Sequence, residues 1–155
     1  MNRNARVGSF CDVRYVPPTP QEMLLVYQRR APAMNDLIAA LPRRDRAHLL
    51  AGCERVELTF ADPLYEPGDR IRHVYFPAEG FISLVTPRDD CTSLEVGLVG
   101  SEGMLGITLM LGVDESSLRA LVQGAGSALR MAAAPFHREL AHSAALQRGL
   151  NRYLY

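Results

Sequence analysis

The spacing of hydrophobic positions changes near residue 54 and divides the chain into two regions. Before this point apolar residues recur three or four positions apart, which is typical of amphipathic helices. Pro32 and Pro42 end the first two predicted helices, and the third buries Leu49 and Leu50 and ends near Gly52. The three helices are predicted over residues 21–31, 34–41 and 43–53. Residues 1–19 show no periodicity, so we expect residues 1–33 to form a loose arm with one short helix.

From residue 55 onward hydrophobic and polar residues alternate, which is the spacing of a β-strand. Val56, Leu58 and Phe60 alternate with Glu57 and Thr59, and turn-forming glycines, prolines and aspartates recur along the following region. So many short strands predict a β-sandwich or a small barrel. The strands are expected over residues 55–60, 64–65, 71–76, 81–86, 92–98, 118–123 and 128–131, with a helical turn over residues 106–111.

Two helices are predicted after the last strand. The first covers residues 135–141, with Pro135 at its first helical position, and the second begins at residue 144. The sequence therefore predicts a mainly β fold with flanking helices. We divide it into residues 1–33, a β-rich domain over residues 34–143, and a terminal helix over residues 144–155.

Composition places the chain among single globular domains of near-neutral charge. It has 155 residues, of which 17 are arginine, none is lysine and 17 are acidic. Residues 1–53 carry a net charge of +4 (8 basic and 4 acidic residues), and residues 54–155 carry −4 (9 and 13). The β-rich region is therefore not a nucleic-acid surface on grounds of charge.

Targeting and redox signals are absent from the sequence. No apolar run approaches the roughly 20 residues of a membrane span, and no signal-type segment follows Met1, so we expect a cytoplasmic protein that does not bind membranes. Cys11, Cys53 and Cys91 are too far apart for a disulfide framework or a Cys-x-x-Cys site, and they are expected to be reduced thiols. We expect no metal and no cofactor.

Three motifs then arrive in order along the β-rich region. They are Leu-Tyr-Glu-Pro-Gly-Asp at residues 64–69, His-Val-Tyr-Phe-Pro-Ala-Glu-Gly at residues 73–80, and a glycine-rich cassette at residues 95–106. Gly68 and Gly80 lie where strand reversals favour positive φ, and Tyr75 and Phe76 supply core area. The first two motifs resemble the β-roll, a double-stranded jelly roll, of cyclic-nucleotide-binding domains. The cassette resembles, more narrowly, the same segment of the Crp/Fnr family of bacterial transcription regulators. The resemblance as a whole covers roughly residues 35–155.

The resemblance implies an effector pocket beside the cassette. Family members that bind a cyclic nucleotide hold its phosphate with a Gly-Glu pair and with an Arg followed by Ser or Thr. The matching positions here are Gly106 and Ile107, and then Ser116 and Ser117, while Gly103 lies within the same cassette. Loss of the acidic and the basic anchor is expected to lower affinity on the order of a thousandfold. Arg119 does not replace the basic anchor, because the strand period places it on the opposite face.

The resemblance also implies a dimerisation helix that begins near residue 144, followed in family regulators by a winged helix-turn-helix. Leu146, Leu150 and Tyr153 mark the seam expected to face a partner subunit. That seam is under two heptads long, so it predicts only a weak homodimer. DNA binding is expected only where a longer chain supplies the helix-turn-helix, because this chain matches a truncated relative or a fragment of such a regulator.

Three functions remain open from the sequence. The first is the effector-sensing and dimerisation domain of a Crp/Fnr-like regulator, with a small-molecule effector whose identity the sequence does not indicate. The second is a stand-alone cyclic-nucleotide-binding protein, which Ile107 and Ser116 disfavour. The third is a cupin-like metal enzyme, in which Tyr75 would replace a metal-binding histidine. We predict the first, and we predict that the protein is not an enzyme.

Overall fold

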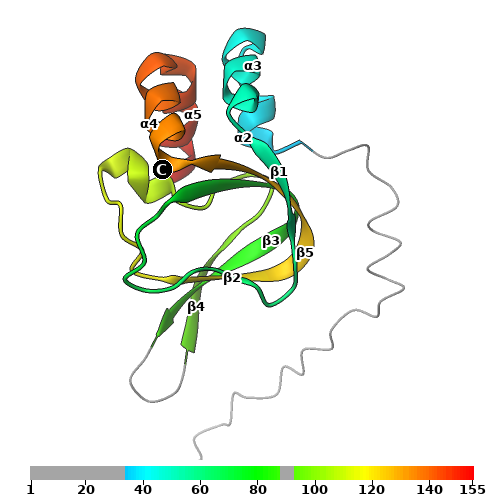
Figure 1. Cartoon of the computed structure of the whole chain (residues 1–155), viewed down its shortest axis with the longest axis vertical. Coiled ribbons are helices and arrows are strands. Elements are labelled where there is room, and N and C mark those ends of the chain that lie inside the picture. The colour runs from blue at the N-terminus through cyan, green and yellow to red at the C-terminus, as the bar shows by residue number, and fades with distance from the viewer. Residues whose placement is uncertain (1–33, 88–92) are drawn as a thin grey trace, which may run out of the picture. The chain divides into compact units, whose positions relative to one another are not determined.

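The structure is a computed structural model of the 155-residue chain, and it describes residues 34–87 and 93–155. The arm and helix expected within residues 1–33 lie outside the described residues, as do Cys11 and Cys91. Figure 1 shows the α-helices gathered at one end of the strands. The elements are α2 (Asp36–Ala39), α3 (Arg43–Ala51), β1 (Glu54–Leu58), β2 (Pro63–Tyr65), β3 (His73–Pro87), β4 (Ser93–Val99), the 3-10 helix η1 (Ile107–Leu111), β5 (Arg119–Ala132), α4 (Ala133–His142) and α5 (Ala144–Leu154).

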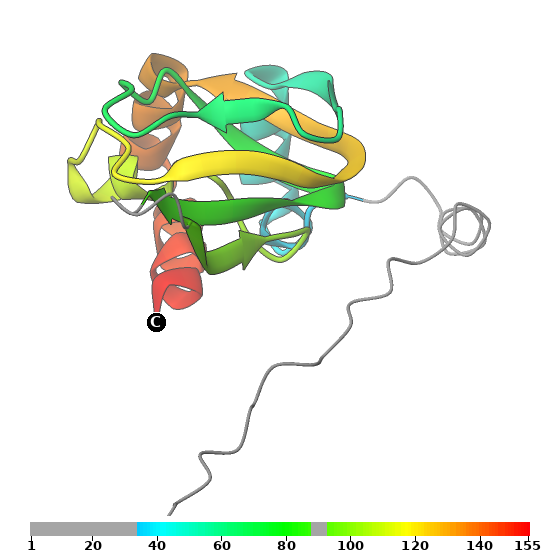
Figure 2. The same cartoon turned by 90° about the horizontal axis from the view of Figure 1, so that it is seen from below.

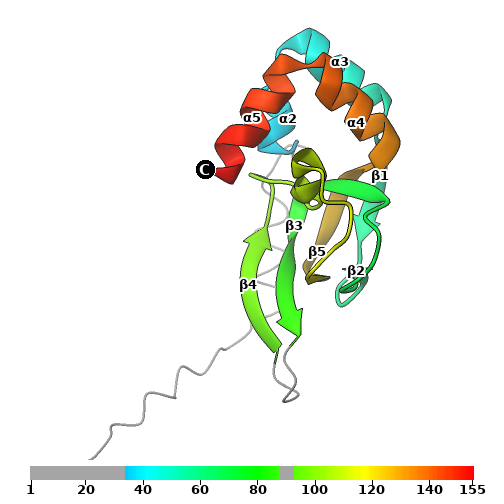
Figure 3. The same cartoon turned by 90° about the vertical axis from the view of Figure 1, so that its left-hand side faces the viewer.

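The strands form one antiparallel sheet in the order β1-β5-β3-β4, and β2 also pairs with β5. In Figure 2 the yellow strand β5 runs beside the green strand β3 along its length. Figure 3 shows the β3–β4 hairpin extending away from the helical end. The predicted class, mainly β with flanking helices, is confirmed.

Two pairs of predicted strands are continuous in the structure. Residues 71–76 and 81–86 belong mostly to the single strand β3, and residues 118–123 and 128–131 to β5. The predicted break after residue 76 is therefore wrong, and Gly80 explains why. Gly80 has the predicted positive φ of 81°, but it bends β3 within the strand at a register shift and does not reverse the chain. A Cβ atom there would lie 2.1 Å from the carbonyl oxygen of Gly124, so glycine lets the two strands bend together.

The described α-helices lie at predicted positions, although α2 covers only 4 residues of the helix predicted over residues 34–41. Helix α3 ends at Ala51 with Gly52 as its C-cap, and it buries Leu49 while Leu50 is half-buried. Helix α4 begins at Ala133, so Pro135 is its third residue and not its first as predicted. The reason is that β5 runs directly into α4, where the Ala133 N–H donates to the carbonyl of Arg72 at 2.8 Å.

The core lies between the roll and the helical end. It contains Phe76 from β3, Phe136 from α4, and both Leu146 and Leu150 from α5, which are 2% and 0% exposed. The expectation that Leu146 and Leu150 face a partner subunit is therefore wrong. Ser143 separates α4 from α5 and caps α5 with its hydroxyl, and the helix then turns its apolar stripe back onto the domain. The described helices include none with the length and apolar composition of a membrane span.

Candidate functional site

The predicted cassette covers the end of β4 and the loop that leads to η1, and two of its four glycines, Gly103 and Gly106, are buried in this loop. Gly106 has a φ of 88° and precedes η1. A Cβ atom on Gly106 would lie 2.8 Å from the hydroxyl oxygen of Tyr65 and 3.0 Å from Val74. Glycine is therefore required both for the backbone conformation and for the close packing of the loop on the core.

The position expected to carry an acidic anchor is apolar, and its side chain faces the core. Ile107 is half-buried and packs against the hydrophobic core. An isoleucine side chain offers no hydrogen bond to a ribose or a phosphate. The first residue of η1 therefore contributes packing to the roll.

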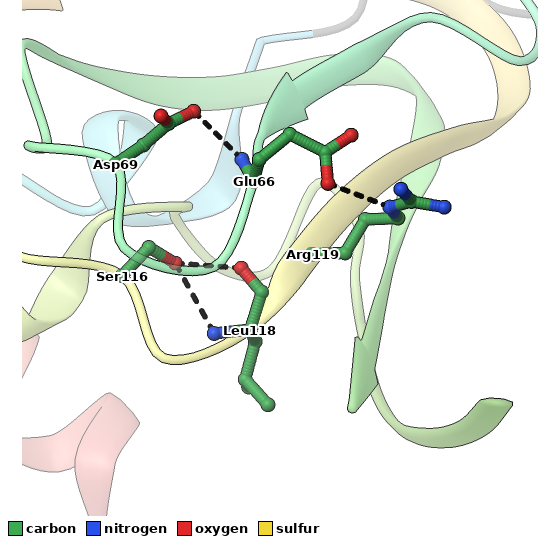
Figure 4. Close-up of polar contacts among 5 residues, drawn as sticks. All are labelled: Glu66, Asp69, Ser116, Leu118 and Arg119. Atoms are coloured by element: carbon green, nitrogen blue, oxygen red, sulfur yellow. Dashed lines mark hydrogen bonds and ion pairs between the residues drawn. The ribbon is translucent and has the colours of Figure 1, made fainter. Parts of the chain in front are cut away.

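Ser116, at the position expected to carry the basic anchor, uses its polar atoms locally. Its hydroxyl donates to the carbonyl of Leu118 at 2.7 Å and accepts from the N–H of Leu118 at 3.4 Å (Figure 4). Its backbone N–H donates to the carbonyl of Asp69 at 2.9 Å, and its carbonyl accepts from the N–H of Gly68 at 2.8 Å. The structure thus pairs Ser116 with the Pro-Gly-Asp turn, while Ser117 is exposed.

The nearest guanidinium is fixed on the surface of the roll. Arg119 Nε lies 2.8 Å from a carboxylate oxygen of Glu66, and the two side chains are 53% and 41% exposed. The Glu66 N–H in turn donates to the carboxylate of Asp69 at 2.9 Å (Figure 4). Ala120, the next residue, is buried. The prediction that Arg119 lies on the outer face of its strand is confirmed, and an acidic neighbour neutralises its charge.

Asn35 binds the cassette loop through its side-chain amide. It is 0% exposed, and its side-chain NH2 donates to the carbonyl of Gly103 at 2.7 Å and to that of Pro77 at 3.0 Å. Its side-chain oxygen caps α2 by accepting from the N–H groups of Leu37 and Ile38 at 3.1 and 3.3 Å. Sequence reasoning missed this residue, although asparagine directly before a helical pattern is an N-cap signal.

Tyr153 from α5 covers the same loop. A Cβ atom on Gly103 would lie 2.2 Å from the Tyr153 oxygen, so the ring lies directly against this glycine. Burial and the nearby Glu102 carboxylate raise the pKa of Tyr153, while a hydrogen bond with the Met104 backbone lowers it. Tyr153 was expected to face a partner subunit together with Leu146 and Leu150. The structure directs it toward the cassette of its own chain.

Two clefts lie at the helical end of the domain. One, of about 450 Å³, lies between α2 and α5 and is lined in part by Glu102, Arg148, Arg152 and Tyr153. The other, of about 650 Å³, lies between α3 and α4 and is lined by charged and polar side chains. Neither cleft is predictable from the sequence, because each combines residues from elements that only the tertiary fold brings together.

Comparison with known proteins identifies the fold. No family model and no curated protein matches the chain. Among solved structures, the N-terminal domain of a transcriptional regulator from Streptomyces coelicolor A3(2) matches with a TM-score of 0.62 and 24% identity, over 81% of this chain and 88% of that one. The Thermus thermophilus catabolite activator protein matches with a TM-score of 0.63 and 18% identity, over 76% of this chain and 55% of that one.

A cyclic-nucleotide-binding domain from Methylobacillus flagellatus KT matches with a TM-score of 0.62 and 10% identity, over 76% of this chain and 69% of that one. This chain spans about half of the length of the catabolite activator. The likenesses show that it has the fold shared by this cyclic-nucleotide-binding domain and by the matching parts of the two regulators. The predicted β-roll is thereby confirmed.

Proposed function

We propose that this chain is the effector-sensing regulatory domain of a Crp/Fnr-like transcription regulator and that it does not bind cyclic nucleotides tightly. The observation that carries the proposal is that the cassette lacks both charged anchors expected for a cyclic nucleotide. The fold around it is similar to that of the N-terminal domain of a transcriptional regulator, but Ile107 and Ser116 stand at the expected anchor positions and Arg119 is bound to Glu66. DNA recognition is assigned to a helix-turn-helix on a longer chain.

A route for the signal supports the same function. Asn35 and Tyr153 both contact the cassette loop at Gly103, one from the start of α2 and the other from the end of α5. An effector that moves this loop therefore also acts on α5. The family resemblance implies that regulation passes through this helix. Self-association through Leu146 and Leu150 is not part of the proposal, because both side chains are buried within one chain.

Isothermal titration calorimetry with cyclic AMP and cyclic GMP tests the state of the cassette. The wild-type chain is expected to give no saturable heat in the micromolar range. Ile107→Glu combined with Ser116→Arg is expected to gain affinity, since it supplies both anchors. Ile107→Glu combined with Ser117→Arg is the matched control, because residue 117 is exposed. Micromolar binding by the wild type would instead make this a cyclic-nucleotide-binding protein.

Hydrogen exchange tests the regulatory role. Any metabolite that binds to the roll, and so raises the melting temperature of the chain, is expected to slow amide exchange in both the cassette loop and α5. The reason is that Tyr153 joins these two segments. Protection of the loop with no change in α5 would contradict signal transfer through this helix.

A further inference from the structure

The cleft between α3 and α4 is lined by the same five-residue pattern twice. The order is arginine, acidic residue, any residue, alanine, histidine. In each copy the arginine and the histidine are four positions apart, which places them on neighbouring turns of one helical face. Six of the seven charged or titratable side chains of the two copies line the cleft, and Arg46 is the exception. The copies are Arg44-Asp45-Arg46-Ala47-His48 on α3 and Arg138-Glu139-Leu140-Ala141-His142 on α4.

The basic groups of this cleft are available to a ligand. Ion pairs in the described part of the chain join Arg70 to Asp114, Arg119 to Glu66 and Arg130 to Glu54, all outside the cleft. The lining residues Arg44, His48, Arg138 and His142 are all exposed. The cleft therefore presents two guanidinium groups and two imidazole rings to solvent.

One imidazole is also oriented by the backbone. His142 Nδ1 lies 2.6 Å from the carbonyl oxygen of Arg138. Because a carbonyl oxygen only accepts, Nδ1 is the donor, and Nε2 is the nitrogen left for a ligand. Ser143, which also lines the cleft, uses its hydroxyl to accept from the N–H of Leu146 at 3.0 Å.

The mixed charge of the lining indicates the class of ligand. Guanidinium groups bind phosphate through two parallel hydrogen bonds. The half-buried carboxylates of Asp45 and Glu139 repel a bare anion but accept hydrogen bonds from hydroxyl or amino groups. A ligand that satisfies both sets carries a phosphoryl group and neutral donors on one small framework. The volume of about 650 Å³ lies within the range of small-molecule sites.

A metal ion fits this cleft less well. Within residues 34–87 and 93–155, no three histidine, cysteine, aspartate or glutamate side chains are grouped so that they could hold a metal ion. Two guanidinium groups in the same cleft would also repel a divalent cation. The organic phosphate is therefore the ligand that the lining favours.

We propose that the α3–α4 cleft binds a small organic phosphate of the nucleotide or sugar-phosphate class. Arg44 and Arg138 bind the phosphoryl group, and His48 donates to it. His142 donates to it from Nε2 when both ring nitrogens carry a proton. Asp45 and Glu139 accept from hydroxyl or amino groups. This site is separate from the cassette, and it stands whether or not the roll senses an effector.

Titration of the whole chain with four probes tests the proposal by heteronuclear NMR. The probes are 5′-AMP, ribose 5-phosphate, adenosine and inorganic phosphate. At least one of the two phosphorylated organic probes is expected to bind saturably and at least tenfold more tightly than adenosine or inorganic phosphate. The shifted resonances are expected to cluster on α3 and α4.

Arginine variants locate the site. Arg44→Gln and Arg138→Gln are each expected to weaken binding by about tenfold or more, since each removes a charge-assisted contact. Arg43→Gln and Arg148→Gln are matched controls, because these exposed arginines lie on α3 and α5 but do not line the cleft. Unchanged melting temperatures show that the variants are folded.

Several outcomes would overturn the proposal. They are the absence of binding by both organic phosphates, equal binding of inorganic phosphate, and an equal loss of binding in the control variants. Zinc binding that requires His48 and His142 but not the arginines would replace it with a metal site. Binding that Ile107→Glu abolishes and Arg44→Gln leaves unchanged would locate the ligand in the roll, and it would bear on the proposed function alone.

Discussion

The aromatic ring of Tyr153 occupies the space that a side chain at position 103 would need. A Cβ atom built on Gly103 would lie 2.2 Å from the Tyr153 oxygen and 2.4 Å from Cζ. Residue 103 is in the loop between β4 and η1, whereas Tyr153 lies near the end of α5. Their contact joins the cassette to α5, so each residue restricts the movement of the other.

Gly103→Ala is expected to destabilise the fold by about 1–3 kcal/mol, the usual cost of overpacking. The methyl group must displace the Tyr153 ring, so the same substitution in a Tyr153→Ala background is expected to cost much less. Urea unfolding of the four proteins gives the coupling free energy. Gly149→Ala is the control and is expected to stabilise α5, because no atom lies within 4 Å of the added methyl group. Additive effects at residues 103 and 153 would show that the contact is not tight.

Asn35→Asp is expected to destabilise the domain by about 3 kcal/mol or more at neutral pH. The carboxylate still accepts from the N–H groups of Leu37 and Ile38, but it cannot donate to the carbonyls of Pro77 and Gly103. Protonation restores one donor, so the deficit relative to wild type should shrink as the pH falls. Thermal unfolding over a pH series measures this, and Asp36→Asn, at an exposed neighbour, is the control. An Asn35→Asp variant as stable as wild type would contradict the role of the amide.

Leu150→Ala is expected to cost about 2–5 kcal/mol, as for other fully buried leucines. Leu150→Arg is expected to unfold the domain, because it buries a charge in the core. Leu154→Ala is the control on the same helix, since Leu154 is 42% exposed, and it should change stability little. Chemical denaturation followed by circular dichroism decides this. A folded Leu150→Arg chain that has lost a dimer would restore the partner-facing interpretation.

Cys53 is expected to react slowly with alkylating reagents while the chain is folded. Burial, followed by the nearby Glu139 carboxylate, raises the pKa of the Cys53 thiol from 9.0 to about 11. The thiolate is the nucleophile, so labelling at pH 8 should be at least about tenfold slower than in the urea-unfolded chain. Mass spectrometry of the peptide that contains Cys53 measures both rates. Equal rates would show that the thiol is not buried and that the Glu139 carboxylate does not repel its thiolate.

The raised pKa of Cys53 also determines how stability changes with pH. The folded state holds the thiol proton more tightly than the unfolded state, so this contribution is fully present below about pH 9 and is lost as the pH rises through about 11. Cys53→Ala should remove that part of the alkaline loss. An equal loss of stability in the wild type and in Cys53→Ala over this pH range would show that other groups cause the loss.

Local sequence signals predicted the elements better than their connections. Residues 43–53 were predicted as a helix because the period and Gly52 agree, and α3 ends one residue before that glycine. The breaks predicted inside β3 and β5 were wrong, because Gly80 permits a bend that turn-forming composition does not distinguish from a reversal. Whether such a glycine ends a strand depends on the opposite strand, which lies more than forty residues away at Gly124.

The site shows the same division between local and tertiary information. The apolar stripe on α5 was predicted correctly, but the period of a helix does not indicate whether Leu150 faces a partner or its own core. Asn35 has an N-cap signal, whereas its bond to Gly103 depends on a loop that follows β4. The two Arg-acidic-x-Ala-His segments are visible in the sequence, yet their significance appears only when α3 and α4 line one cleft.

The position of β5 also determines when the chain can fold. Its register pairs Arg130 with Glu54 and Ala132 with His73, so β1, β2 and β3 all depend on the last strand to be synthesised. Such distant pairings slow folding, because loop-closure entropy is lost before the contacts form. On the ribosome, β1 and β2 therefore emerge without a partner. The roll closes only after β5 has left the exit tunnel, and until then the early strands are exposed to aggregation and to chaperones.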